Sequence, residues 1–482
     1  MFSGKEILTR QSTEANKDPL APNSESSVDE DKLLRKIDFH VLPILWVIYV
    51  AAFLDRANIS DALTLGLPEE LGLGTRQVSI MLAIFFVPYT ICEIPANILM
   101  KRLNPHNWLS GCIVAFGLVT IGQGFVQSYE GLLVARFFLG IFEAGVFPGC
   151  FYLISFWYKR HEAQKRFTIY FSSVIVSNAF CGLLAGAIAK LDGYRGLSSW
   201  RWVFILEGTA TIIIGFIAFF SITDFPMEAD WVAPDERALI LVKTNSDESH
   251  RVRITLKHML DFLSKPIHWF GGMILNFIIS IVIADGLLAL GIPVYTIAFF
   301  VPIIVQSLGY GPVQTQLYSV PPHAAGLVFS IVLAYVSDKY RIRSLPIFVG
   351  LALMISGMAL LTSLGDTSSF PTEYAALCLT TVGACGSGGI IICWWVMNLR
   401  GHVERSIGSG WIITLGSLGA IIATFTFKRD VRFYHTGYTV GLSAAVLCAV
   451  VCALYGMLIW RQRKAEARSE GTDEIKRDPL WL

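Results

Sequence analysis

Apolar stretches of about 20 residues follow one another along this chain, and they constrain its fold more than any other feature. In the first half they lie near 39–59, 77–99, 108–127, 131–153, 167–189 and 202–222. In the second half they lie near 267–306, 316–337, 344–364, 373–398, 407–427 and 438–461. A helix that crosses a bilayer needs roughly 20 apolar residues. The pattern therefore predicts an all-α membrane protein with twelve transmembrane helices in two six-helix bundles.

Composition agrees with this prediction. The chain is 54% hydrophobic and 16% charged, whereas a soluble domain has about 25% charged residues. The formal net charge is +1, which gives no indication of a nucleic-acid partner. We expect a multi-pass integral membrane protein that has the lipid bilayer as its environment and binds no nucleic acid.

A polar segment separates the two sets of apolar runs. It contains too many Pro, Asp, Glu, Lys and Arg residues to cross a membrane, although DERALILVKT within it favours a short amphipathic helix. The predicted organisation is a cytoplasmic disordered tail at 1–37, an N-terminal bundle at 38–222, a cytoplasmic linker at 223–264, a C-terminal bundle at 265–462 and a cytoplasmic tail at 463–482.

Lys and Arg residues predict the orientation. They are more frequent in the loops after the second, fourth, eighth and tenth runs than on the opposite side, which places both tails and the linker in the cytoplasm. The first apolar run is too late and too long for a signal sequence, so we expect no cleavable signal peptide. The plasma membrane is the expected location, with the vacuolar membrane as the alternative.

Residues 267–306 depart from the pattern because they are long enough for nearly two crossings. Two crossings would move the basic loops that follow to the outside, against the charge bias. We therefore expect one crossing plus an inserted segment around Ile278–Leu290, which carries Asp285. A re-entrant or broken helix and retained non-coding sequence of the gene are both compatible, and no functional residue is assigned there.

One predicted crossing contains two charged residues. Residues 131–158, GLLVARFFLGIFEAGVFPGCFYLISFWY, carry Arg136 and Glu143. Seven residues are almost two helical turns, so both side chains leave the same face. A lipid-facing charge costs at least about 2.5–3.5 kcal/mol, so this face should point into protein or a water-filled cavity. A structural ion pair between helices is the alternative, and a transport pathway is the preferred interpretation.

Polar residues also end the first run. Asp55 and Arg56 are adjacent and leave a helix about 100° apart, so one can line a cavity while the other addresses a neighbouring helix. Asn58 adds an uncharged hydrogen-bonding group. The alternative is a charged helix end at the outer interface.

Two sets of polar residues are predicted at a gate or in helix contacts. Tyr89, Glu93 and Asn97 stand four residues apart, which forms a polar stripe on one helix face, with a proline between them that can kink the helix. Asp338 and Arg341 belong to a charged cytoplasmic turn after the eighth run.

The second half offers few ionisable groups inside its crossings. His323, Trp394, Trp395 and Asn398 are the candidates for lining a substrate cavity there. A histidine beside two prolines is also typical of a structural position, and tryptophans are also typical of cores and membrane interfaces. We expect charge chemistry in the first half, and shape and stacking surfaces in the second.

Other chemistry is not indicated. The nine cysteines lie in apolar stretches without zinc-type spacing, which favours simple packing. The sequence has no GxxxxGK[ST] phosphate loop, so ATP-driven transport is disfavoured. We expect no cofactor and no metal.

Several stretches resemble the major facilitator superfamily, and more narrowly the anion:cation symporter family in its fungal, allantoate-permease-like branch. They are LDRANISDA at 54–62, YTICEIPANILMKR at 89–102, ARFFLGIFEAGVFPGCFYLISFWYKRHEAQKR at 135–166, SSWRWVFILEG at 198–208, FFVPIIVQSLGY at 299–310, YSVPPHAAG at 318–326, SDKYRIR at 337–343 and WWVMNLRGHVERS at 394–406.

This resemblance implies two bundles around a central cavity that opens alternately to either side. It also implies that Arg56 binds an anionic substrate, that Asp55 and Glu143 couple protons, and that Arg136 interacts with such a carboxylate. The region 267–306 departs from the family's pattern, which puts the geometry there in doubt.

The function expected from these features is proton-coupled symport of a small organic anion, such as a carboxylate or a vitamin-like acid. Arg56 would bind the anion, while Glu143 would take up a proton, lose its charge and release Arg136. We expect a secondary active transporter that acts as a monomer and is not an enzyme. An efflux carrier driven by proton antiport and a non-transporting membrane sensor are the alternatives.

Overall fold

The structure is a computed structural model. It describes residues 29–100, 103–158, 160–244, 292–296, 299–307, 309–340, 342–364, 370–398, 416–426 and 435–469. The described residues form helices, turns and short connections, without a β-strand among them. Within this described part, nine helical spans are long and apolar enough to cross a membrane.

The first half contains α1 to α10. The bounds are α1 Glu30–Thr64, α2 Leu67–Glu70, α3 Thr75–Ile84, α4 Phe86–Met100, α5 Pro105–Gln123, α6 Tyr129–Glu143, α7 Val146–Trp157, α8 Arg160–Ile188, α9 Ser199–Ser221 and α10 Pro234–Thr244. Two short 3₁₀ helices, η1 Ala189–Leu191 and η2 Tyr194–Gly196, connect α8 to α9.

The second half contains four labelled helices, α15 Pro312–Tyr340, α16 Ser344–Ser363, α17 Phe370–Asn398 and α19 His435–Ser469. Residues 292–296, 299–307 and 416–426 are also helical. The predicted insert at Ile278–Leu290 lies outside the described residues, as do residues 245–264 of the predicted linker. The predicted domain boundaries therefore stay predictions.

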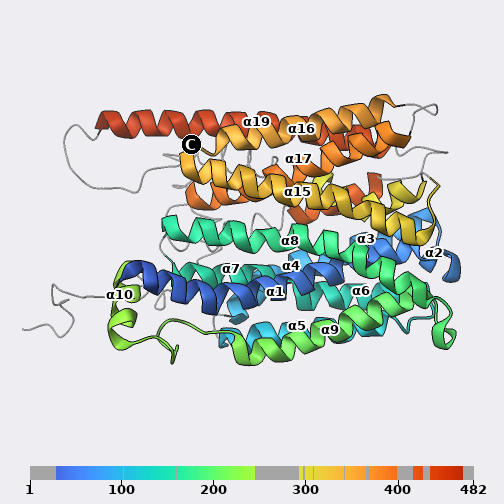
Figure 1. Cartoon of the computed structure of the whole chain (residues 1–482), viewed down its shortest axis with the longest axis horizontal. Helices are drawn as coiled ribbons and strands as arrows, with labels where there is room; N and C mark the ends of the chain where they lie inside the picture. Colours follow the sequence, from blue (N-terminus) through green and yellow to red (C-terminus); the bar gives the residue numbers. More distant parts are fainter. Residues whose placement is uncertain are drawn as a thin grey trace, which may run out of the picture.

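The helices of the two halves lie side by side (Figure 1). Within the first half α1 packs against α8 and α9, and α5 packs against α9. Within the second half α17 packs against α15 and α16. The halves meet where α8 contacts α15. A Cβ atom on Gly182 of α8 would lie 2.9 Å from the carbonyl oxygen of Gln316 in α15, so glycine permits this close approach.

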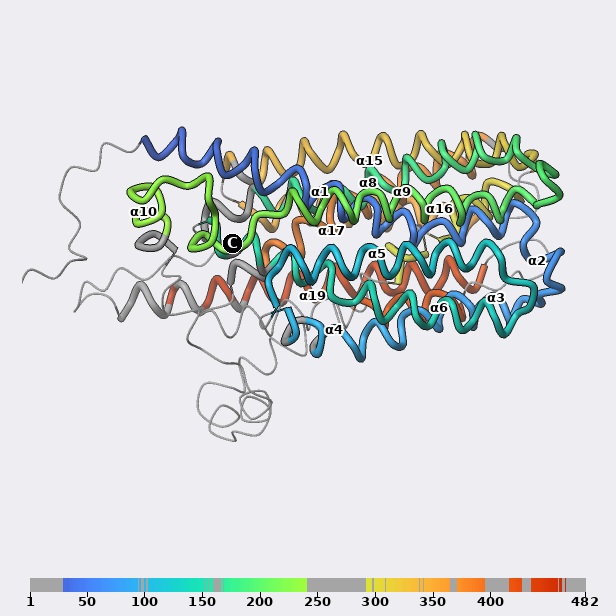
Figure 2. Tube along the Cα trace, turned by 90° about the horizontal axis from the view of Figure 1, so that it is seen from below, coloured from blue at the N-terminus to red at the C-terminus, as the bar shows by residue number. Residues whose placement is uncertain are grey.

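Both views place the beginning of α1, α10 and the end of α19 at one end of the molecule (Figures 1 and 2). Helices α2 and α3 lie at the other end, which we call the α2 end. At the first end, Lys36 of α1 forms an ion pair of 2.7 Å with Glu236 of α10. Trp231 stacks on Trp157 of α7 at 5.2 Å. These contacts attach α10 to the helices of the first half.

Helix α1 is longer at both ends than the predicted run 39–59. Asp29 caps its start by accepting hydrogen bonds from the backbone of Asp31 and Lys32, so the helix begins inside the predicted disordered tail. It continues to Thr64, which places Asp55 and its neighbours inside the helix and not at its end.

Two predicted crossings are broken by proline. The second divides at Phe85, between α3 and α4, and the fourth divides at Ala144 and Gly145, between α6 and α7. Each break lies three or four residues before a proline, Pro88 or Pro148, whose ring clashes with the carbonyl group four residues earlier.

Helix α4 runs through Pro95 without a break, and the kink predicted there stays a prediction. The interruption of the second crossing lies at Phe85, ahead of Pro88.

A glycine allows α6 to approach the break between α3 and α4. A Cβ atom on Gly140 would lie 2.2 Å from the carbonyl oxygen of Phe85 and 2.9 Å from the ring of Pro88. We expect Gly140→Ala to destabilise the protein by about 1–3 kcal/mol through overpacking. Thermal unfolding in detergent should therefore show a lower melting temperature.

Gly111 of α5 provides a matched control, because a Cβ atom there would meet nothing within 4 Å. Gly111→Ala should be neutral or slightly stabilising, since alanine favours helix by roughly 0.5–1 kcal/mol over glycine. Equal melting temperatures for the two variants would contradict the close approach at Gly140.

Candidate functional site

A buried ion pair joins α1 to α6. The guanidinium group of Arg56 donates from Nε to Glu143 Oε1 at 3.0 Å, and its Nη2 donates to the same oxygen. The side chains are only 4% and 1% exposed. The second oxygen of Glu143 has no hydrogen-bond partner among the described residues. One carboxylate oxygen of Glu143 is thus bound to Arg56, and the other is available to accept a hydrogen bond.

Arg56 also reaches the second half of the chain. Its Nη1 donates to the hydroxyl group of Tyr295, at 3.2 Å, in the helical segment 292–296. Three rings surround the guanidinium carbon, at 5.3 Å for Phe53, 5.2 Å for Phe85 and 4.8 Å for Tyr89. Aromatic faces stabilise a cation in a desolvated position.

Arg136 is buried but lacks a comparable partner. Its Nε and Nη2 form no hydrogen bond with the described residues, and its guanidinium carbon lies 5.9 Å from the ring of Phe204. In this state Glu143 makes its hydrogen bonds to Arg56, and Arg136 acts on Glu143 only through its charge, so the expected release of Arg136 stays a prediction. Seven residues along a helix separate two side chains by about 10 Å, whereas Arg56 faces Glu143 directly.

Asp55 and Glu207 add two buried carboxyl groups. Both oxygens of each lack a hydrogen-bond partner among the described residues. The hydroxyl groups of Thr120 and Thr211 approach Asp55, and Asn58 approaches Glu207, without meeting hydrogen-bond geometry. Asp55 is 0% exposed, so the alternative of a charged helix end at the interface is wrong.

The charges in this cluster do not balance. Asp55, Arg56, Arg136, Glu143 and Glu207 form what we call the acid–arginine cluster, with three carboxyl groups and two guanidinium groups. If all five were ionised, one negative charge would remain buried without compensation, which costs several kcal/mol. The arrangement therefore favours a bound proton within the cluster, shared according to how the groups interact.

Glu207 borders a crevice of about 110 Å³ between α1, α8 and α9. The crevice is lined mainly by apolar side chains, including Trp46 and Leu184, with Thr211 beside the carboxyl group. Glu207 was overlooked in the sequence, although an ionisable residue inside the apolar run 202–222 is the same signal that singled out Glu143.

The remaining predicted residues are dispersed. Glu93 is buried in α4 and Trp394 in α17, where Trp394 packs on Tyr455 with ring centroids 4.6 Å apart. His323 is buried in α15, and its Nδ1 donates to the carbonyl oxygen of Ser319 at 2.9 Å. The Nε2 atom of His323 is left as an acceptor without a partner in the described part.

Five predicted site residues cannot be placed. The side chains of Asn97, Asp338, Trp395 and Asn398 and the whole of Arg341 lie outside the described residues.

Tyr295 was missed because residues 267–306 looked irregular and were given no functional residue. No sequence rule pairs a tyrosine there with Arg56, since the contact spans 239 positions.

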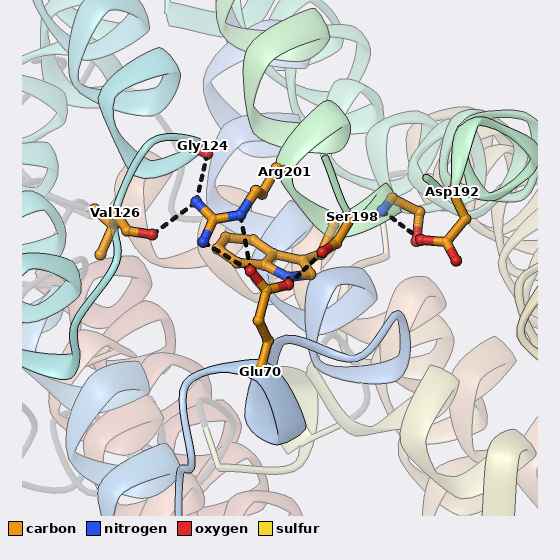
Figure 3. A network of polar contacts seen from close by, with 8 residues as sticks. Glu70, Gly124, Val126, Asp192, Ser198 and Arg201 are labelled. Atoms are coloured by element: carbon orange, nitrogen blue, oxygen red, sulfur yellow. Dashed lines mark hydrogen bonds and ion pairs between the residues drawn. The ribbon is translucent and has the colours of Figure 1, made fainter. Parts of the chain in front are cut away.

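A second polar network lies at the α2 end (Figure 3). Glu70 Oε1 accepts from Arg201 Nε at 3.0 Å and Nη2 at 2.8 Å, and Oε2 accepts from Trp200 at 2.6 Å and from Ser198. Arg201 also donates to the backbone carbonyl of Val126 at 2.7 Å. The network ties the loop before α6 and the start of α9 to α2, so its role is structural.

The pH dependence of this network follows from Glu70. Burial alone would raise the pKa of Glu70, but hydrogen bonds from Ser198, Arg201 and Trp200 outweigh it and hold the pKa below its ordinary value. The contribution of Glu70 to stability is then present above the ordinary glutamate pKa and is lost as pH falls through the lower, folded value.

We expect Glu70→Gln to lower the melting temperature at neutral pH, with the difference from wild type shrinking under acid conditions. The neighbouring exposed Glu69 gives the control, as Glu69→Gln should change little at any pH. Melting curves across a pH series check this, and a difference that is independent of pH would contradict it.

Comparisons with known proteins agree with the arrangement. Residues 45–424 match the profile of the Major Facilitator Superfamily. The chain is 29% identical over 473 residues to the MFS-type transporter cnsO of Penicillium expansum, covering 94% of this chain and 88% of that one. It is 28% identical over 398 residues to a candidate tartrate transporter of Agrobacterium vitis, covering 82% and 87%.

Solved structures share the fold. A bacterial homologue of the human lysosomal transporter Spinster, inward-facing and unoccupied, aligns with a TM-score of 0.62 and 16% identity, over 87% of this chain and 96% of that one. The proton:xylose symporter XylE aligns with a TM-score of 0.66 and 15% identity, over 86% and 95%. The prediction of an all-α membrane protein with this superfamily's fold is confirmed.

Proposed function

Because the chain belongs to the major facilitator superfamily, we propose that it takes up a small organic anion together with protons, by alternating access. It is a multi-pass membrane transporter and not an enzyme. The observation that carries the proposal is the position of Arg56, which is bound to Glu143 of its own half and to Tyr295 of the other half.

The anion part rests on the chemistry of Arg56. Its partner in this state is a carboxylate, so a substrate carboxylate can replace Glu143 with the same charge and geometry. Arginine stays protonated at any accessible pH, so this site keeps its charge in each state of the transport cycle. The similarity to a candidate tartrate transporter supports an organic acid as the substrate class.

The proton part rests on the excess of carboxyl groups. Protonation of Glu143 removes its attraction for Arg56, which leaves the guanidinium group free for the substrate. Asp55 and Arg136 belong to the same cluster, and we assign them to proton coupling with Glu143. A proton and an anion then enter together, since the cluster tolerates the anion best when a carboxyl group is neutral.

The coupling to conformation rests on Tyr295. A ligand shifts an equilibrium between two states only if it interacts differently with each of them. Substrate on Arg56 competes with Glu143 and changes the contact with Tyr295, and that contact exists only when the halves are close together at this level.

The other predicted residues keep lesser roles in the proposal. Asn58, His323, Trp394, Trp395 and Asn398 are assigned to the substrate cavity, where the unpartnered Nε2 of His323 can accept from a substrate hydroxyl group. Glu93, Asn97, Asp338 and Arg341 are assigned to gating or helix contacts.

The role of Glu143 can be tested by Glu143→Gln in proteoliposomes. We expect accumulation of labelled carboxylates driven by a proton gradient to be lost, while exchange of labelled for unlabelled anion continues, because Arg56 can still bind the anion. Glu130→Gln, on the exposed start of the same helix, is the control and should accumulate substrate like wild type. Accumulation that still follows the proton gradient in Glu143→Gln would remove Glu143 from proton coupling.

The role of Arg56 can be tested by Arg56→Lys. Lysine keeps the charge but cannot present two donors in a fixed plane, so we expect KM for the anion to rise by about tenfold or more. The exposed Arg76 is the control, and Arg76→Lys should leave KM unchanged. An unaltered KM in Arg56→Lys would place anion binding elsewhere.

Import and export by this protein can be distinguished by a separate uptake measurement in cells. Import predicts that cells expressing the protein accumulate labelled anion when the outside is acidic, whereas proton antiport predicts depletion of preloaded anion. A panel of mono- and dicarboxylates in a thermal-shift assay on the purified protein identifies the compounds to use.

A further inference from the structure

Asp61 is a buried acid that the proposed transport mechanism does not use. It lies on α1, is 2% exposed, and accepts a hydrogen bond at 2.8 Å from the thiol group of Cys181 in α8. The amide group of Gln316, in α15 of the second half, approaches the same carboxyl group as a donor without meeting hydrogen-bond geometry. Three helices, two from one half and one from the other, therefore meet at Asp61.

The residues next to Asp61 form a seam between the two halves. Thr64 accepts at its hydroxyl group from Gln316 Nε2 at 2.8 Å and at its carbonyl group from Gln306 Nε2 at 3.2 Å. Ser60 donates to the carbonyl group of Phe299. We call Ser60, Asp61 and Thr64 with these partners the inter-half seam. The α1 residues of the seam lie on the last turns of that helix, which runs toward the α2 end, away from its own beginning and from the end of α19 (Figures 1 and 2).

Nothing among the described residues compensates a negative charge on Asp61. The groups that act on it are the thiol of Cys181 and the amide of Gln316, and neither is a cation. The nearby titratable groups are acids, with Glu207 on α9 and, beyond it, Asp55 on α1. An ionised Asp61 would thus be a buried charge beside other acids, which costs several kcal/mol.

The inter-half seam also contains a buried hydrogen-bond acceptor that has no donor among the described residues. Gln316 Oε1 is buried and has no hydrogen-bond partner among the described residues, although the Nε2 atom of the same amide donates to Thr64. A protonated Asp61 would carry an O–H group beside this amide, whereas an ionised Asp61 is an acceptor only. The thiol of Cys181 and the amide of Gln316 approach Asp61 as donors, which favours its charged form, but burial without a cation outweighs them and suits the closed seam to the neutral acid.

We propose that Asp61 is a second proton-binding site, separate from the acid–arginine cluster, and that its protonation closes the inter-half seam. When Asp61 is neutral, it can remain buried between α1, α8 and α15, and the halves stay together at the α2 end. When it loses the proton, the charge needs water, and the seam opens to supply it. With the chain termini in the cytoplasm, as the basic loops predict, this seam faces the outside.

Spin labels across the seam provide the test. Glu69→Cys in α2 and Gln314→Cys in α15 are exposed positions on opposite sides of the seam, and pulsed electron resonance measures the distance between them. The measurement uses the full-length protein in lipid nanodiscs over a pH series without substrate. Protein without the two introduced cysteines gives the labelling background of the native thiols.

In the wild-type background we expect a short distance at acidic pH and a longer one at alkaline pH. The ratio of open to closed molecules should change by at most about tenfold per pH unit, the limit for one titrating group. Asp61→Asn cannot ionise and should stay closed at every pH. Thr64→Val removes a seam hydrogen bond but no titratable group, so it should favour the open form while keeping the pH dependence.

Cys181→Ala gives a second variant that leaves Asp61 in place. The thiol donates to the carboxylate and so favours its charged form, and its removal should move opening to higher pH. A distance that does not depend on pH in the wild type overturns the proposal. So does an unchanged titration in Asp61→Asn, or a midpoint in Cys181→Ala that stays in place or moves to lower pH.

This inference rests on the proposed proton coupling for its physiological role, but its test does not require transport. If the seam titrates through Asp61 while uptake shows no dependence on a proton gradient, the proton site stands and the proposed symport fails. If uptake depends on the proton gradient while the seam distance does not depend on Asp61, the proposed symport stands and the second proton site fails. Glu143→Gln should abolish gradient-driven accumulation yet leave the seam titration intact.

Discussion

The cost of a buried charge is the constraint on which this structure depends. Arg56 and Glu143 lie in membrane-spanning helices and almost without solvent contact, so each charge offsets much of the cost of burying the other. The aromatic rings around Arg56 add to the stability of the cation but cannot replace its carboxylate. Removal of either partner would leave the other as a buried charge without its main partner. In our proposal, a competing anion or a proton on Glu143 opens this pair.

The Arg56–Glu143 pair also lies at a contact between the two halves. Arg56 contacts Glu143 within its own half and Tyr295 of the other half, and the inter-half seam begins one turn further along α1. Helix α1 therefore carries both Arg56, which we propose binds the anion, and residues that contact the other half at the α2 end. In our proposal, a change in charge beside Arg56 or at Asp61 acts directly on contacts between the two halves.

Interruptions in two neighbouring helical crossings position Glu143, the acid of the ion pair. Helix α6 ends at Glu143, because Pro148 prevents the chain from continuing as one straight helix. Pro88 breaks the neighbouring crossing in the same way, and Gly140 lets α6 approach the backbone at that break. Two prolines and one glycine thus position Glu143 against α1. The sequence predicted the crossings here but not their division, since the cost of a proline inside a helix depends on what the neighbouring helices can satisfy.

The sequence by itself determined the class of fold and singled out the charged residues inside the crossings. Apolar runs of membrane-spanning length predicted the helices, and Arg56, Arg136 and Glu143 stood out because charge is rare in such runs. Only the tertiary structure decided that Glu143 binds Arg56 and leaves Arg136 without a carboxylate partner among the described residues. Helical periodicity reports which side chains share a face, whereas a contact between two helices depends on how they pack, and no spacing within one helix contains that information.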